Sequence, residues 1–148
     1  MNLPDHDPDR ASSRLSPQSV EGRFAVVLNC IDGRAQQPLL EWVRARYGVD
    51  YVDVVTEPGV DAVLALGDAV TLEVLLDRVR VSQRAHLARN LVVAGHHDCA
   101  ANAVPRPVHE AQIRTAVHRV RAALPEFEVA GVYLDQSWTP SFVVDHDA

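Results

Sequence analysis

The chain has 148 residues, of which 47% are hydrophobic and 23% charged, and its formal net charge at pH 7 is −6. These values are ordinary for a folded globular protein, and the length fits one domain with one core. All 14 basic residues are arginines, which excludes Schiff-base chemistry and the Walker lysine. An acidic chain without a basic run is not expected to bind nucleic acid. No segment has the roughly 20 consecutive apolar residues that cross a bilayer, so no membrane partner is expected.

The first 23 residues differ in composition from the rest of the chain. They are polar, rich in Pro, Ser and Asp, and contain no apolar stretch typical of a secretion signal. We interpret residues 1–23 as a disordered leader, residues 24–148 as a single domain, and the protein as cytoplasmic.

The remaining sequence alternates between strand and helix patterns. Residues 24–32 form a short apolar run, typical of a strand covered on both faces, and residues 36–48 carry a helical stripe that ends at a glycine. Residues 51–59 predict a second strand. A helical region follows and becomes, between Thr71 and Leu87, a long amphipathic helix.

The second half repeats this alternation. Residues 90–99 predict a third strand, 109–125 a helix, 127–137 a fourth strand and 141–147 an edge strand. Strands that alternate with helices imply right-handed crossovers and a mostly parallel sheet. The predicted fold class is α/β: a mostly parallel four-stranded sheet flanked by helices, with an extra edge strand as a candidate. The strand order 2-1-3-4 is assumed at this point.

The only two cysteines of the chain end two of these strands. Cys30 follows the first strand in "CIDGR", and Cys99 follows the third in "GHHDC". If the two strands are neighbours, their carboxyl ends meet where open parallel sheets bind ligands. Two cysteines and one histidine form a known catalytic zinc set with an open fourth position. We therefore expect Cys30, His96 and Cys99 to hold one Zn²⁺ per chain, with His97 as the rival to His96.

Asp32 and Arg34 belong to the first of these motifs. Strand alternation predicts that both lie on the same face as Cys30. A carboxylate near zinc must either bind the metal or be held away from it by a cation. Arg34 can hold Asp32 through a two-point ion pair, which predicts a working site that closes if the pair breaks.

With these residues the sequence resembles the β-class carbonic anhydrases, whose hallmark is Cys-x-Asp-x-Arg followed much later by His-x-x-Cys. The matching residues are Cys30, Asp32, Arg34, His96 and Cys99. The resemblance implies a zinc-dependent lyase that reversibly hydrates carbon dioxide to bicarbonate by zinc-bound hydroxide, with Asp32 and Arg34 as the catalytic dyad. It also implies the order 2-1-3-4, a small-molecule substrate, and a homodimer or higher homo-oligomer. His97 and His109 are candidate proton shuttles by position.

Three features depart from the family pattern. Ala100 follows the second cysteine where the family usually has glycine, "TEPGVDA" with Glu57 replaces the frequent Arg-Asn-Ala-Gly, and the leader has no counterpart of the long N-terminal helices. A related hydrolase of carbonyl sulfide or carbon disulfide is therefore an alternative, as is a non-catalytic zinc domain with Asp32 as fourth ligand. A redox disulfide between the two cysteines is disfavoured because the chain lacks Cys-x-x-Cys.

Overall fold

The computed structural model describes residues 21–147. The predicted leader, apart from its last three residues, lies outside the described residues. The strands are β1 (Phe24–Asn29), β2 (Tyr51–Thr56), β3 (Asn90–His96), β4 (Glu128–Leu134) and β5 (Pro140–Val144). The helices are the short 3-10 helix η1 (Gly33–Ala35), then α2 (Gln36–Tyr47), α3 (Val60–Leu66), α4 (Ala69–His86) and α5 (Arg106–Ala123).

The five strands form one sheet in the order β2-β1-β3-β4-β5. The first four are parallel, and β5 pairs with β4 antiparallel. The predicted α/β class and the order 2-1-3-4 are confirmed, with β5 as the extra edge strand. The neighbours β1 and β3 are in register from Val26 with Leu91 to Leu28 with Val93, so their carboxyl ends lie side by side.

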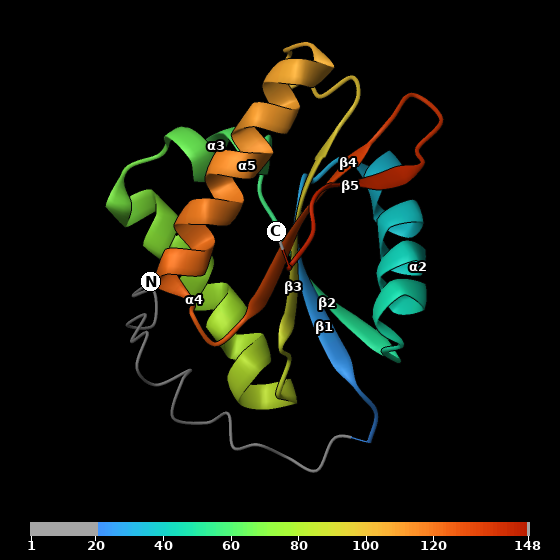
Figure 1. Ribbon diagram of the computed structural model, residues 1–148, viewed down its shortest axis with the longest axis vertical. Coiled ribbons are helices and arrows are strands. Elements are labelled where there is room, and N and C mark those ends of the chain that lie inside the picture. The colour runs from blue at the N-terminus through green and yellow to red at the C-terminus, as the bar shows by residue number, and fades with distance from the viewer. Residues whose placement is uncertain (1–20, 148) are drawn as a thin grey trace, which may run out of the picture.

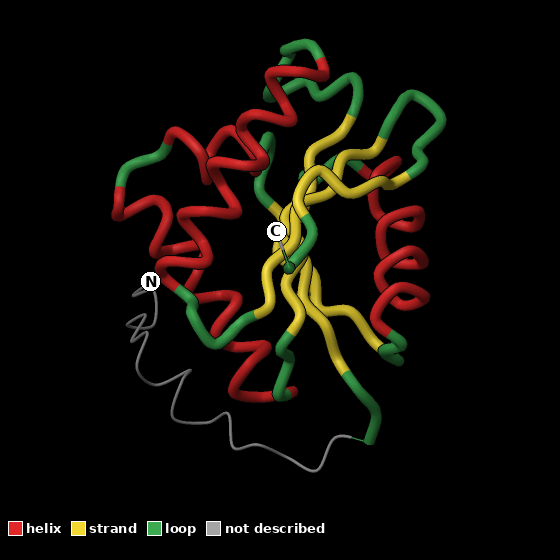
Figure 2. The backbone as a smooth tube through the Cα atoms, in the orientation of Figure 1, coloured by secondary structure: helices red, strands yellow, loops and turns green. Residues whose placement is uncertain are grey.

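Helices cover both faces of the sheet (Figure 1). Helix α2 lies on one face, while α3, α4 and α5 lie on the other, and the three-layer arrangement is clear in Figure 2. Side chains alternate along β1: Val26 and Leu28 join the larger core under α3, α4 and α5, and Ala25 and Val27 join the core under α2. This two-sided burial explains why the strand appears as an unbroken apolar run.

The two strands that precede the cysteines, β1 and β3, are shorter than the sequence pattern predicts. The predicted ranges 24–32 and 90–99 end in the structure at Asn29 and His96. After β1 the chain turns into η1. After β3 it passes through a turn in which Asp98 has a φ of 55°. Cys30 and Cys99 therefore lie in loops at the carboxyl ends of β1 and β3. Across the described residues, no helix combines the length and the apolar character that a membrane span requires.

Candidate metal centre

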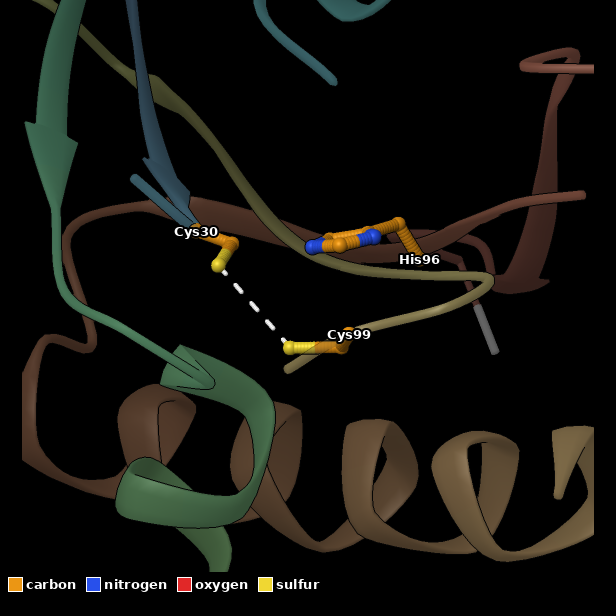
Figure 3. Close-up of side chains that lie close together, drawn as sticks. All are labelled: Cys30, His96 and Cys99. Carbon is orange, nitrogen blue, oxygen red and sulfur yellow. Dashed lines mark hydrogen bonds between the residues drawn. The ribbon is translucent and has the colours of Figure 1, made fainter. Parts of the chain in front are cut away.

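The structure brings Cys30, His96 and Cys99 together at the carboxyl ends of β1 and β3. One ligand atom from each lies within 4.8 Å of the others. Figure 3 shows the two thiols and the imidazole ring pointing toward the same space. All three residues are buried, and the two cysteines are free thiols. Adjacent parallel strands whose ends each continue into a tight turn produce this convergence.

The imidazole of His96 has its lone pair directed at this space. Its Nδ1 lies 2.7 Å from the carbonyl oxygen of His97, and because a carbonyl only accepts, Nδ1 carries the proton. Nε2 is then the unprotonated nitrogen. It is buried without a hydrogen-bond partner. Among the described residues, the one other buried side-chain nitrogen or oxygen atom without a partner is Oδ1 of Asn29. A buried acceptor without a donor is costly, and a metal ion would satisfy it.

The donor set fits zinc. The Sγ atoms of Cys30 and Cys99 lie 3.9 Å apart. Two thiolates at the usual Zn–S distance of about 2.3 Å and a tetrahedral angle would be roughly 3.8 Å apart. The backbone carbonyl that holds Nδ1 of His96 is the usual outer partner of a metal-bound histidine. The residues present could therefore supply three of the four ligands of a tetrahedral site.

Backbone N–H groups act on both cysteine thiols. The N–H of Gly59 points at Sγ of Cys30, with the two atoms 3.5 Å apart. Gly59 has a φ of +59°, and a side chain there would press on the backbone of Ala101. Burial raises the pKa of the Cys99 thiol, and hydrogen bonds from the N–H groups of Ala101 and Asn102 act in the opposite direction. These donors would stabilise thiolates beside a metal ion.

Asp32 and Arg34 form a two-point ion pair next to the cysteine cluster. Nη2 of Arg34 lies 2.7 Å from Oδ2 of Asp32, and Nε lies 3.1 Å from Oδ1. Oδ1 also accepts from the backbone N–H of Arg34 at 2.9 Å, which caps η1. These contacts lower the pKa of Asp32 to about 2. A turn, and not the predicted strand alternation, brings the two side chains together, because β1 ends before both residues.

Arg34 has two further partners that the sequence analysis did not identify. Its Nη1 lies 3.1 Å from Oδ2 of Asp98, in the turn between His96 and Cys99. Its guanidinium also lies over the Trp138 ring, 4.8 Å from the ring centroid. Asp98 is visible within the "HHDC" motif, whereas Trp138 follows β4 far along the chain and only the fold brings it here.

The other histidine and carboxylate candidates lie elsewhere. His97 is exposed and its ring is not part of the cluster; its backbone N–H donates to the carbonyl of Leu134 at 2.9 Å. His109 is buried and bonded to Asp61, so it has no direct access to solvent. Glu57, after β2, is half-buried and its backbone N–H donates to the carbonyl of Asn29 at 3.0 Å.

The fold and the cluster define a class: an α/β domain with a Cys/His/Cys group at the carboxyl edge of a parallel sheet. The sequence model of a family described as putative carbonic anhydrase matches residues 20–144. The chain belongs to this family and is a divergent member of the β-class, as the resemblance of its motifs predicted. No curated protein matches the chain.

Solved carbonic anhydrases, two of them described as β-class, have the same fold. The chain is 14% identical to a carbonic anhydrase from Glaciozyma antarctica, with a TM-score of 0.57 and 97% of each chain covered. It is 14% identical to the β-carbonic anhydrase CafD of Aspergillus fumigatus, with a TM-score of 0.53 and coverage of 88% of this chain and 94% of that one. It is 12% identical to a β-carbonic anhydrase from Sordaria macrospora that is described as tetrameric, with a TM-score of 0.51 and coverage of 91% of this chain and 84% of that one.

Proposed function

We propose that the protein is a zinc-dependent carbonic anhydrase that reversibly hydrates carbon dioxide to bicarbonate, with one Zn²⁺ held by Cys30, His96 and Cys99. The observation that carries the proposal is the convergence of the three side chains on one space, with the lone pair of His96 Nε2 unsatisfied. When bound, zinc supplies Lewis-acid chemistry that makes water a nucleophile near neutral pH. The family to which the chain belongs supports the same reaction.

In this proposal Asp32 and Arg34 orient the reacting water. Asp32 is ionised at neutral pH, since its pKa lies near 2, so it can accept a hydrogen bond from the attacking water and aim the oxygen lone pair at carbon dioxide. Arg34 holds both carboxylate oxygens of Asp32, which keeps the carboxylate out of the fourth ligand position. Asp32 is not among the clustered ligand atoms, which favours an open site over the closed, non-catalytic one.

Metal analysis and stopped-flow kinetics test this function. Protein purified without chelators should contain one zinc per chain and accelerate carbon dioxide hydration at about pH 8. Cys30→Ser should lower both the zinc content and the rate. Carbonyl sulfide, offered in parallel, distinguishes the related hydrolase. Zinc-loaded protein that leaves both substrates at the buffer rate would overturn the catalytic proposal.

We also infer that the chain forms a homo-oligomer and acts on a small molecule in the cytoplasm. The outer edge of β2 pairs with no other strand of the described residues, and an unpaired edge invites a partner strand. The Sordaria macrospora relative is described as tetrameric. The interpretation of residues 24–148 as one domain belongs to the same proposal, and sedimentation of the full chain checks the assembly.

A further inference from the structure

A buried polar cluster lies directly behind the proposed metal centre. Its central contact joins Oδ2 of Asp61, in α3, to Nδ1 of His109, in α5, at 2.6 Å. The two side chains are only 2% and 1% exposed. An ionised carboxylate only accepts, so Nδ1 of His109 donates to it. Burying such a pair is weak grounds for stability, since an apolar pair of similar size is often as stable. Its presence therefore calls for a role beyond stability.

Asn102 joins this pair to the loop that carries Cys99. Its Nδ2 donates to Oδ1 of Asp61 at 3.0 Å and to Oε1 of Gln112 at 2.7 Å, which uses both amide hydrogens. The backbone N–H of Asn102 lies 3.2 Å from the carbonyl oxygen of Cys99. The side chain of Asn102 is therefore anchored from α3 and α5, while its backbone closes the turn at Cys99.

Asp61 also lies close to the segment that carries His96 and to the residue that contacts Cys30. The carboxylate of Asp61 packs against Gly95, directly before His96, and a Cβ on Gly95 would collide with it. Asp61 lies in the first turn of α3, and the N-cap residue of that helix is Gly59, whose N–H points at the sulfur of Cys30. The Asp61 carboxylate thus contacts the residue before His96 and the side chain of Asn102 in the Cys99 loop, while the helix of Asp61 begins next to the residue whose N–H points at Cys30.

We propose that Asp61 and His109, acting through Asn102, are positioning residues that hold the Cys99 loop in the geometry needed to bind the metal ion. This inference rests on the proposed metal centre. In the resulting picture the buried pair orients the Asn102 amide, the amide fixes the 99–102 turn, and the turn keeps Sγ of Cys99 near Sγ of Cys30 and Nε2 of His96.

The test measures zinc affinity of the full chain by competition with a chromophoric chelator. Asp61→Asn and Asn102→Ala should each weaken zinc binding by roughly 10-fold to 100-fold, as losses of outer partners of metal ligands do. Asn102→Ala leaves the Asp61–His109 pair intact, so it creates no unpaired buried charge. It therefore decides the outcome if Asp61→Asn does not fold.

Two control variants separate positioning from a general loss of packing. Asp53→Asn breaks a pair of the same chemistry and length, in which Oδ2 of Asp53 lies 2.6 Å from Nδ1 of His86 between β2 and α4. Its zinc affinity should stay within about 2-fold of wild type, because neither residue touches the Cys99 loop. His109→Asn keeps an amide donor near the position of Nδ1 and should bind zinc more tightly than His109→Leu.

A second readout follows the geometry itself. In protein loaded with Co²⁺, the thiolate-to-cobalt absorption bands should shift or weaken in Asp61→Asn and Asn102→Ala and stay unchanged in Asp53→Asn. If the cluster were merely structural, the same substitutions would lower the free energy of unfolding without changing these bands. Wild-type protein that binds zinc, together with unaltered affinity and spectra in both variants, would overturn the positioning role alone. Wild-type protein that binds no zinc would overturn the proposed metal centre and the positioning role together.

Discussion

Arg34 binds both carboxylate oxygens of Asp32, with Nη2 2.7 Å from Oδ2 and Nε 3.1 Å from Oδ1. The two residues are separated by Gly33 only, so the 3-10 turn that follows β1 is what brings them face to face. A two-point ion pair of this kind restrains the direction of the carboxylate as well as its charge. In the proposed enzyme, this restraint determines whether Asp32 orients the reacting water or binds the metal.

Arg34→Ala should abolish most of the activity without loss of zinc. Asp32, no longer held, would be free to turn toward the metal and occupy the fourth position. We expect the rate of carbon dioxide hydration to fall by roughly 100-fold or more, since an oriented acid–base group contributes about that much. Stopped-flow kinetics and metal analysis on the same sample check this. The exposed Arg44 of α2 provides a matched control, Arg44→Ala, and full turnover in Arg34→Ala would show that the dyad is misread.

Substitution of Trp138 should lower the hydration rate less than Arg34→Ala does, because Trp138 acts through Arg34. Its ring lies beneath the guanidinium of Arg34, and a half-exposed cation–π contact is worth about 0.5 to 1 kcal/mol. Trp138→Leu should therefore reduce the hydration rate by only about 2-fold to 5-fold, and Trp138→Phe by less, because the aromatic face is kept. A loss as large as that of Arg34→Ala would mean that Trp138 contacts the substrate instead.

Removal of the metal should expose the two thiols to oxidation. Their sulfur atoms are 3.9 Å apart, so a modest movement brings them to bonding distance in an oxidising solution. We expect chelated protein treated with a mild oxidant to form a Cys30–Cys99 disulfide, detected by mass spectrometry, and zinc-loaded protein to resist it. At zinc concentrations about 100 times its dissociation constant, the metal should also stabilise the fold by about 2.7 kcal/mol. Equal oxidation rates with and without zinc would contradict ligation by these cysteines.

Gly131 should tolerate no side chain. It lies in β4 beneath α5, where a Cβ would collide with Ile113 and press on Val117. Gly131→Ala should lower the free energy of unfolding by about 1 to 3 kcal/mol, as overpacking of a filled core does. Urea denaturation measures this. Gly33→Ala is the matched comparison, because nothing lies within 4 Å of a Cβ there and its stability should be nearly that of wild type.

The stability of the protein should depend on pH in acid partly because Asp68 caps the N-terminus of α4. Oδ1 of Asp68 accepts from the backbone N–H of Thr71 at 2.8 Å, and this hydrogen bond lowers the pKa of Asp68 below its ordinary 3.8. Because the folded state has the lower pKa, the stabilisation is present above about pH 4 and is lost as the pH falls through the folded value. The stability difference between wild type and Asp68→Ala should therefore be constant from about pH 8 to pH 5 and shrink below about pH 4. Chelator in every sample keeps metal occupancy constant, and a difference that grew in acid would refute the assignment.

The class of fold and the members of the candidate site were accessible from the sequence because both leave local patterns. A strand buried on both faces must be a short apolar run, as in β1 and β3, and an amphipathic helix must repeat its apolar residues at helical spacing, as in α4. The placement of Cys30 and Cys99 directly after such runs predicted that they meet, on the assumption that β1 and β3 are neighbours. The strand order had to be assumed, since periodicity says nothing about which strands pair.

Tertiary structure decided the features that depend on distant parts of the chain. The ring of Trp138 under Arg34 and the Asp61–His109 pair behind the cysteines have no local signature, because each joins elements separated by dozens of residues. The strand ends at Asn29 and His96 were also set by context: the following residues turn to reach the site instead of continuing the sheet. Local sequence determined which side chains are available for the chemistry, and long-range packing determined how each is held, since only the folded chain supplies partners from other elements.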